Sequence, residues 1–116
     1  MRIQITTQAV PLTSTLRELV HTRLQYALGR FAHRIGDAAA SFEDLNGPRG
    51  GPDVQCRIKL QLRPRGEVNV SAVAASPGAA LSEAAQRASR CVKSRIRRRW
   101  MVRRRTRASF SVGSVA

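Results

Sequence analysis

The sequence predicts an α+β domain with the element order β-α-β-β-β-α, a two-layer sandwich in which two helices pack on one face of a four-stranded mixed sheet. Apolar and polar residues alternate strictly over residues 54–63, as in a strand with one buried and one wet face. Apolar residues recur at helical spacing over residues 14–33 and again after Pro77. Because 116 residues suffice for one modest core, we expect a single domain at residues 1–100 and a basic, flexible tail at 101–116.

The N-terminal part of the chain predicts a strand followed by a helix. Residues 2–7 alternate, with Ile3 and Ile5 on one side, which is typical of a half-buried strand. Thr13 is a favourable N-cap for a helix over residues 14–33. That helix carries one apolar stripe, made of Leu16, Leu19, Val20, Leu24, Ala27, Leu28 and Phe31.

The central part predicts three further strands. Residues 37–45 form a weaker strand, and residues 46–53 (NGPRGGPD) have the composition of a turn. Residues 54–63 form the clearest strand, a tight turn follows at 64–67, and residues 68–75 complete a hairpin. The inward-facing residues of the clearest strand are Val54, Cys56, Ile58, Leu60 and Leu62.

A second helix begins at Pro77, because Ser76 is a good N-cap and proline is favoured at the first helical position. A right-handed crossover through the first helix places the first two strands parallel, and the other strands form a meander. The apolar stripe of the second helix consists of Leu81, Ala84, Ala85, Ala88, Cys91, Val92 and Ile96.

The net charge is +14, from 21 Lys or Arg and seven Asp or Glu. Such a charge opposes a compact fold unless a polyanion neutralises it. Residues 84–107 hold about half of the basic residues and no acid, which favours nucleic acid as the partner, because arginine binds phosphate in bidentate fashion and stacks on bases. The alternatives for this basic run are a solvent-exposed face without a partner and binding to an anionic membrane surface. The membrane is disfavoured because the apolar stripe of this helix is small and committed to the sheet.

Most basic residues of the second helix fall on its outer side, opposite the apolar stripe. Arg95 and Arg99 fall instead where apolar residues are expected, and a charge is costly to bury there. We therefore expect the helix to pass the edge of the sheet near Lys93 and to project into solvent. Gln86 alone suits the reading of base edges, so recognition of backbone and shape is favoured. The outer basic residues are Arg87, Arg90, Lys93, Arg97 and Arg98.

The open face of the sheet carries a second basic stripe, formed by Arg57, Lys59 and Arg63. Solubility and protection of the sheet account for this stripe, and a second phosphate-contacting surface is the alternative. His21 and His33 have no Cys or carboxylate at metal-ligand spacing, so we expect them to be surface residues.

The two cysteines, Cys56 and Cys91, make neither a disulfide framework nor a zinc pattern. Both fall on apolar stripes, so we expect two buried free thiols, with a disulfide between them as a minor alternative.

The sequence offers little for catalysis. The one close acidic pair, Glu43 and Asp44, consists of neighbours on a strand, whose side chains point to opposite faces of the sheet. No glycine-rich phosphate loop precedes a helix. We therefore expect no enzyme activity, no metal or other cofactor, and no small-molecule substrate. The sequence contains no apolar run of about eighteen residues and no signal peptide at its N-terminus, so we expect a cytoplasmic protein without membrane contact.

The element order and both helices resemble those of the bacterial ribosome hibernation-promoting factors, also called ribosome-associated inhibitors or ribosomal subunit interface proteins. Residues 12–31 (LTSTLRELVHTRLQYALGRF) are similar to the first helix of that family. Residues 76–98 (SPGAALSEAAQRASRCVKSRIRR) are similar to its capped, alanine-rich and then basic second helix. The resemblance covers residues 1–99 and indicates a short form of the family.

This resemblance implies a cytoplasmic protein that binds the small ribosomal subunit of stationary or stressed cells, in the channel for tRNA and mRNA, and inhibits translation. Off the ribosome we expect a monomer. A general structured-RNA-binding module and a DNA-associated architectural protein are the alternatives. By the resemblance, ribosomal RNA is contacted by Arg17, Arg23, Arg87, Arg90, Lys93 and Arg97, to which the basic run adds Arg95 and Arg98.

Overall fold

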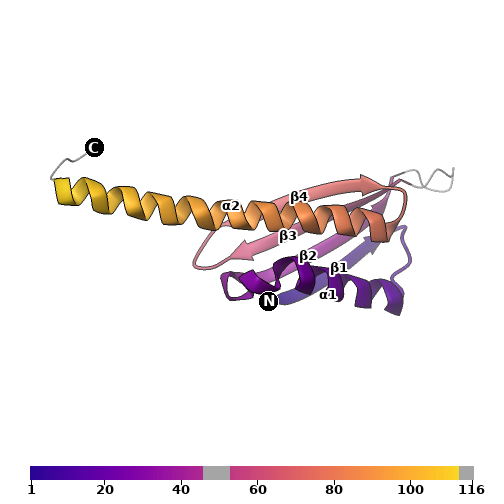
Figure 1. The fold of residues 1–116 in the computed structure, drawn as a ribbon. Coiled ribbons are helices and arrows are strands. Elements are labelled where there is room, and N and C mark those ends of the chain that lie inside the picture. Colours follow the sequence, from indigo (N-terminus) through magenta and orange to yellow (C-terminus); the bar gives the residue numbers. More distant parts are fainter. Residues whose placement is uncertain (46–52, 113–116) are drawn as a thin grey trace.

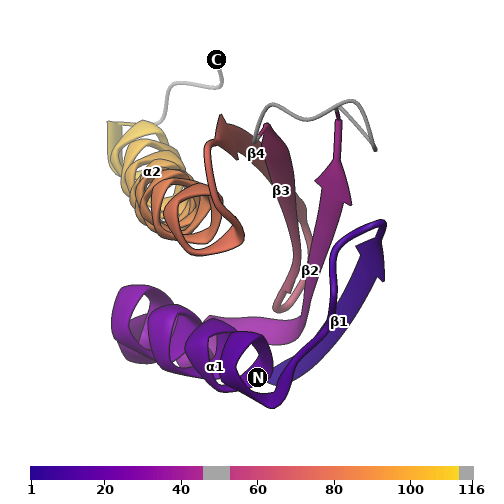
Figure 2. The same cartoon turned by 90° about the vertical axis from the view of Figure 1, so that its right-hand side faces the viewer.

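The fold is the predicted two-layer α+β sandwich, with both helices on the same face of a four-stranded sheet (Figures 1 and 2). The computed structural model describes residues 1–45 and 53–112, with side chains up to residue 98. The turn expected at residues 46–53 therefore lies, up to residue 52, outside the described residues. The elements are β1 (Arg2–Gln8), α1 (Ser14–Leu28), a short 3-10 helix η1 (Gly29–Arg34), β2 (Ile35–Asp44), β3 (Val54–Leu62), β4 (Glu67–Ala74) and α2 (Pro77–Val112).

The strands follow one another across the sheet in the order β1-β2-β3-β4. β1 and β2 are parallel, as the crossover through α1 predicts, and the other two pairs are antiparallel. The tight turn between β3 and β4 is closed by the N–H of Leu62, which donates to the carbonyl of Gly66 over 2.8 Å. Gly66 has a φ of 113°, a conformation that glycine adopts without steric cost.

The core lies between the sheet and the two helices, and every buried side chain in the described part of the chain is apolar. From β3 it takes Val54, Cys56, Ile58 and Leu60, which confirms the predicted alternation. Phe42 of β2 is the largest fully buried side chain. The helices contribute narrow stripes, formed by Leu16, Val20, Leu24 and Leu28 of α1 and by Ala80, Leu81, Ala84, Ala85, Ala88 and Val92 of α2.

Both predicted N-caps are present. The hydroxyl oxygen of Thr13 accepts a hydrogen bond from the N–H of Leu16 at 3.1 Å, and that of Ser76 accepts one from Ala79 at 3.2 Å. Near the start of α2, a Cβ on Gly78 would lie 3.4 Å from Cδ2 of Leu19. This is an ordinary van der Waals distance, so the start of α2 lies beside Leu19 of α1.

The first helix is shorter than the predicted range of residues 14–33. The α-helix ends at Leu28, and the next six residues tighten into η1. Leu28 itself has φ −121° and ψ −4°, outside the α region, and Gly29 has a low helix propensity. The chain must also turn back at once, because Ile35, the first residue of β2, is fully buried.

The prediction that Cys91 is buried is wrong, whereas Cys56 is buried as expected. Between Ala88 and Arg98, Val92 is the one buried residue. The buried stripe of α2 is therefore narrower here than the apolar stripe predicted from the sequence. Cys91 lies about 100° from Val92 around the helix, on a flank that nothing covers. Both thiols are free, so the minor disulfide alternative is not realised.

The second helix projects beyond the sheet, as expected. The residues from Lys93 to Arg98 are exposed apart from half-buried Ile96. Figure 1 shows α2 continuing well past the hairpin of β3 and β4, and the longest dimension of the molecule is 64 Å. The helix runs on to Val112 through residues assigned to a tail from the sequence, and the flexibility of that tail remains a prediction.

The different burial of the two cysteines predicts different reactivity. Burial raises the pKa of the Cys56 thiol to about 12, so at neutral pH it is a protonated and inaccessible group. We expect a thiol reagent to modify one cysteine in the native protein and both after denaturation. Cys91→Ser should abolish the native reaction. Rapid modification of two thiols in the native protein would contradict the burial of Cys56.

Candidate nucleic-acid interface

A basic groove of about 530 Å³ runs between α1 with η1 on one side and α2 on the other. Arg23 and Arg30 enter it from the first side, and Arg90 enters it from the second. No acidic residue lines it. Its lining consists of Arg23, Tyr26, Ala27, Arg30, Ser82, Ala85, Gln86, Ser89 and Arg90, which we call the interhelical groove.

The spacing of residues on the two helices explains this groove. Arg23, Tyr26 and Ala27 are separated by three and one positions, so they share the flank of α1 that faces α2, and Arg30 of η1 lines the same groove. The lining residues of α2 follow a similar spacing. Figure 2 shows the two helices side by side on the sheet, and Gly78 near the start of α2 lies beside Leu19 of α1.

The three arginines of the interhelical groove keep their hydrogen-bond donors available. None of them makes a hydrogen bond or an ion pair with another described residue. The guanidinium carbon of Arg30 lies 5.1 Å from the centre of the Phe31 ring, a cation–π contact that orients its plane. Three guanidinium groups without an acidic partner among the described residues, around one hollow, have the chemistry to bind an anion.

The flank of α2 that faces the groove remains basic beyond the end of η1. Lys93 and Arg97 lie within about 60° of Arg90 around the helix axis, on the side of the groove, and both are exposed. Arg87 and Arg98 lie about 60° and 80° away on the other side, and Arg95 lies further round. The predicted basic residues of α2 thus spread over about 200° of its circumference.

On α1, only one of the two predicted contact residues reaches the groove. Arg23 lines it, whereas Arg17 is exposed elsewhere. The six positions between them correspond to about 120° around the helix. Arg17 therefore offers its charge to a different part of any ligand.

Arg87 is already engaged within the protein. Its guanidinium forms an ion pair with Glu83 at 2.9 Å and donates to the carbonyl of Ser71 at 2.5 Å. The basic run has no acid of its own, but Glu83 immediately precedes it and supplies a carboxylate at i−4 spacing. Arg87 thus connects α2 to the edge strand β4.

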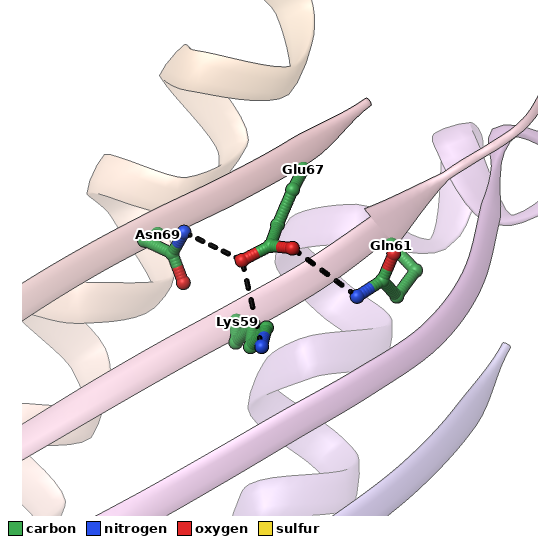
Figure 3. Close-up of polar contacts among 4 residues, drawn as sticks. All are labelled: Lys59, Gln61, Glu67 and Asn69. Carbon is green, nitrogen blue, oxygen red and sulfur yellow. Dashed lines mark hydrogen bonds and ion pairs between the residues drawn. The ribbon is translucent and has the colours of Figure 1, made fainter. Parts of the chain in front are cut away.

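The open face of the sheet is partly neutralised (Figure 3). Glu67 accepts hydrogen bonds from Asn69 at 2.8 Å and Gln61 at 3.3 Å, and lies 3.5 Å from Nζ of Lys59. These contacts lower the pKa of Glu67, above all the hydrogen bond from Asn69 and then the charge of Lys59. Lys59 therefore has a partner on the sheet, which supports the solubility interpretation for this member of the basic stripe.

Sequence reasoning did not select Tyr26, Arg30 or Gln86 as contact residues. Arg30 and Tyr26 could have been found from their spacing of seven and three positions relative to Arg23. Gln86 was considered only as a side chain suited to reading base edges, without a place in a groove. The spacing within one helix does not reveal how the two helices are positioned relative to each other, and this register decides which of their flanks face one another.

Within the described ranges, no group of three or more His, Cys, Asp or Glu residues is placed to hold a metal ion. Among the same residues, no helix has both the length and the apolar character needed to cross a membrane.

The fold and the groove define an α+β domain that presents a basic helical layer, and comparison with solved structures identifies the fold. The structure is similar to the N-terminal domain of Protein Y from Thermus thermophilus, with a TM-score of 0.68 and 22% sequence identity, covering 81% of this chain and 98% of that one. It is also similar to a ribosomal subunit interface protein from Coxiella burnetii, with a TM-score of 0.67 and 18% identity, covering 81% and 96%.

No protein-family model matches the sequence, and no curated protein does either. At these identities the two structures show a shared fold. The resemblance stated from the sequence is therefore confirmed at the level of the fold, because the four-stranded mixed sheet with two helices is shared with these two proteins.

The surroundings of Arg87 and Arg90 predict different roles in RNA binding. Arg90→Gln should weaken binding and reduce the dependence of log K on log salt by about 0.7–0.9, the loss of one phosphate contact. Arg87→Gln should change the slope less, because its guanidinium is held by Glu83 and Ser71. Titration of a labelled RNA at several salt concentrations measures both slopes. A larger effect at Arg87 than at Arg90 would contradict the importance of the groove.

Proposed function

We propose that this protein is a cytoplasmic ribosome-associated factor that binds RNA of the small ribosomal subunit through its helical layer and inhibits translation. The observation that carries the proposal is the convergence of unpaired Arg23, Arg30 and Arg90 on one groove, from which Lys93 and Arg97 continue along α2. The fold shared with a ribosomal subunit interface protein supports the ribosome as the source of that RNA.

The distribution of acids supports the helical layer as the binding side. Of the seven acidic residues, only Glu18 and Glu83 lie in α1 or α2. The others lie in the strands or next to them, and Glu83 is paired with Arg87. The protein therefore presents a positive side and a nearly balanced side, which orients it toward a polyanion during diffusion. The acids on or beside the strands are Asp37, Glu43, Asp44, Asp53 and Glu67.

The projecting part of α2 suits a confined RNA channel. From Val92 to the end of the helix at Val112, twenty residues correspond to about 30 Å. Exposed Arg95, Arg97 and Arg98 point in several directions around it, so phosphates on more than one wall can be contacted at once. Such contacts read backbone position and shape instead of base sequence. A helix lodged in the channel for tRNA and mRNA would exclude both, which is how the protein would inhibit translation.

In this proposal Arg17, Arg23, Arg90, Lys93, Arg95, Arg97 and Arg98 contact ribosomal RNA, and Arg87 contributes less. The protein binds as a monomer, needs no cofactor and catalyses no reaction. Stressed or stationary cells, in which idle ribosomes accumulate, are the proposed setting.

Sedimentation through a sucrose gradient with purified ribosomal subunits tests the proposal. We expect the protein to migrate with the small subunit and the whole ribosome at moderate salt, and to reduce protein synthesis in a cell-free system. The variant with Arg23→Gln, Arg90→Gln and Lys93→Gln should stay at the top of the gradient. Arg57→Gln is the control, because it removes an exposed charge from the sheet face.

Two results would contradict the proposal. In one, the unmodified protein remains at the top of the gradient while it binds naked duplex RNA, which would indicate a general RNA-binding module. In the other, it prefers duplex DNA to ribosomes, which would indicate an architectural DNA-binding protein.

A further inference from the structure

We propose that the interhelical groove binds one unpaired nucleotide of the RNA, with its base stacked on Tyr26 and its phosphates held by Arg23, Arg30 and Arg90. This inference rests on the proposed function in that the ligand is an RNA. It adds that the groove selects an unpaired base of the RNA, and it assigns a role to the aromatic side chain of Tyr26.

Tyr26 is unusually exposed for an aromatic residue. Its exposed fraction is 88%, whereas the other exposed large apolar residues of the described chain, Leu12, Leu45 and Val73, reach 37–48%. Tyr26 contributes nothing to the core, whose stripe on α1 passes through Leu24 and Leu28. A large, rigid and accessible ring on the rim of a basic groove is the arrangement by which proteins stack unpaired bases.

The position of Tyr26 between arginines adds a second, independent argument. Arg23 precedes it by three positions on the same flank of α1, Arg30 follows it in η1, and all three side chains line the groove. Arg90 faces them from α2. A nucleotide carries its base between two phosphates, so a ring flanked by cations matches the order of groups along an RNA strand.

The size and the polar lining of the groove favour one nucleotide over a duplex. A hollow of about 530 Å³ falls in the range of sites for small ligands, whereas a double helix is far too wide to enter. Gln86, Ser82 and Ser89 line the floor on the α2 side and offer an amide and two hydroxyl groups to a base edge or a ribose hydroxyl. Stacking accepts any base, so we expect little sequence preference.

The test compares single-stranded and double-stranded RNA on the full-length protein. The probes are a fluorescently labelled octauridylate and a labelled blunt duplex of twelve base pairs. Loss of base stacking is worth roughly 1–3 kcal/mol, so Tyr26→Ala should weaken octauridylate binding by about tenfold or more. Duplex binding should change by less than about twofold, because the arginines remain. Tyr26→Phe should bind both probes like the unmodified protein, since the ring is retained.

Leu45→Ala is the matched control, because it removes another exposed apolar side chain that lies away from the groove. It should leave both affinities unchanged. Thermal unfolding should show that Tyr26→Ala keeps its stability, as expected for an exposed helical position.

Unchanged octauridylate binding by Tyr26→Ala would overturn the inference, as would equal losses on both probes. Competition by free uridine monophosphate as strong as that by RNA would overturn the commitment to an RNA strand. Failure of the nucleotide site can be distinguished from failure of the proposed ribosome binding. If Tyr26→Ala still migrates with ribosomes and the arginine variant does not, ribosome binding stands and the nucleotide site falls.

Discussion

The packing of small side chains along α2 is the constraint on which the rest of the structure depends. Ala80, Ala84, Ala85 and Ala88 of α2 are all buried in the core. Close packing through alanine occupies a narrow strip of the helix, so most of its circumference remains available for cations. Larger residues on this strip would displace α2 from the core that it covers, because a close-packed core accommodates extra volume poorly, and the interhelical groove would change shape.

The electrostatics of the protein follow from this arrangement. Local pairs neutralise part of the charge, Glu83 with Arg87 and Glu67 with Lys59, and both pairs involve the sheet or its edge. The arginines of the interhelical groove have no such partner among the described residues, so a bound anion would reduce their mutual repulsion. RNA binding should therefore raise the free energy of unfolding of the protein, because a ligand that prefers the folded state stabilises it.

Much of the fold could be predicted because its signals are local. Alternation in β3, the N-caps Thr13 and Ser76, and the handedness of the crossover fix the elements and their order. The end of α1 at Leu28 and the exposure of Cys91 could not, because they depend on where β2 must begin and how far the sheet and α1 cover α2. The groove was only half predicted for the same reason. The family resemblance implied contacts by Arg23 and Arg90, but the register between the helices also brings Arg30 and Tyr26 into the groove.

The central claim is that α2 lies against small-subunit RNA, and the exposed Cys91 allows a direct test. An iron chelate attached to Cys91, with Cys56 protected by burial, generates hydroxyl radicals that cut nearby RNA when the protein is bound to ribosomes. We expect cuts in small-subunit RNA around the channel for tRNA and mRNA, and their loss when tRNA occupies the channel. Cuts confined to large-subunit RNA, or cuts that tRNA leaves unchanged, would contradict it.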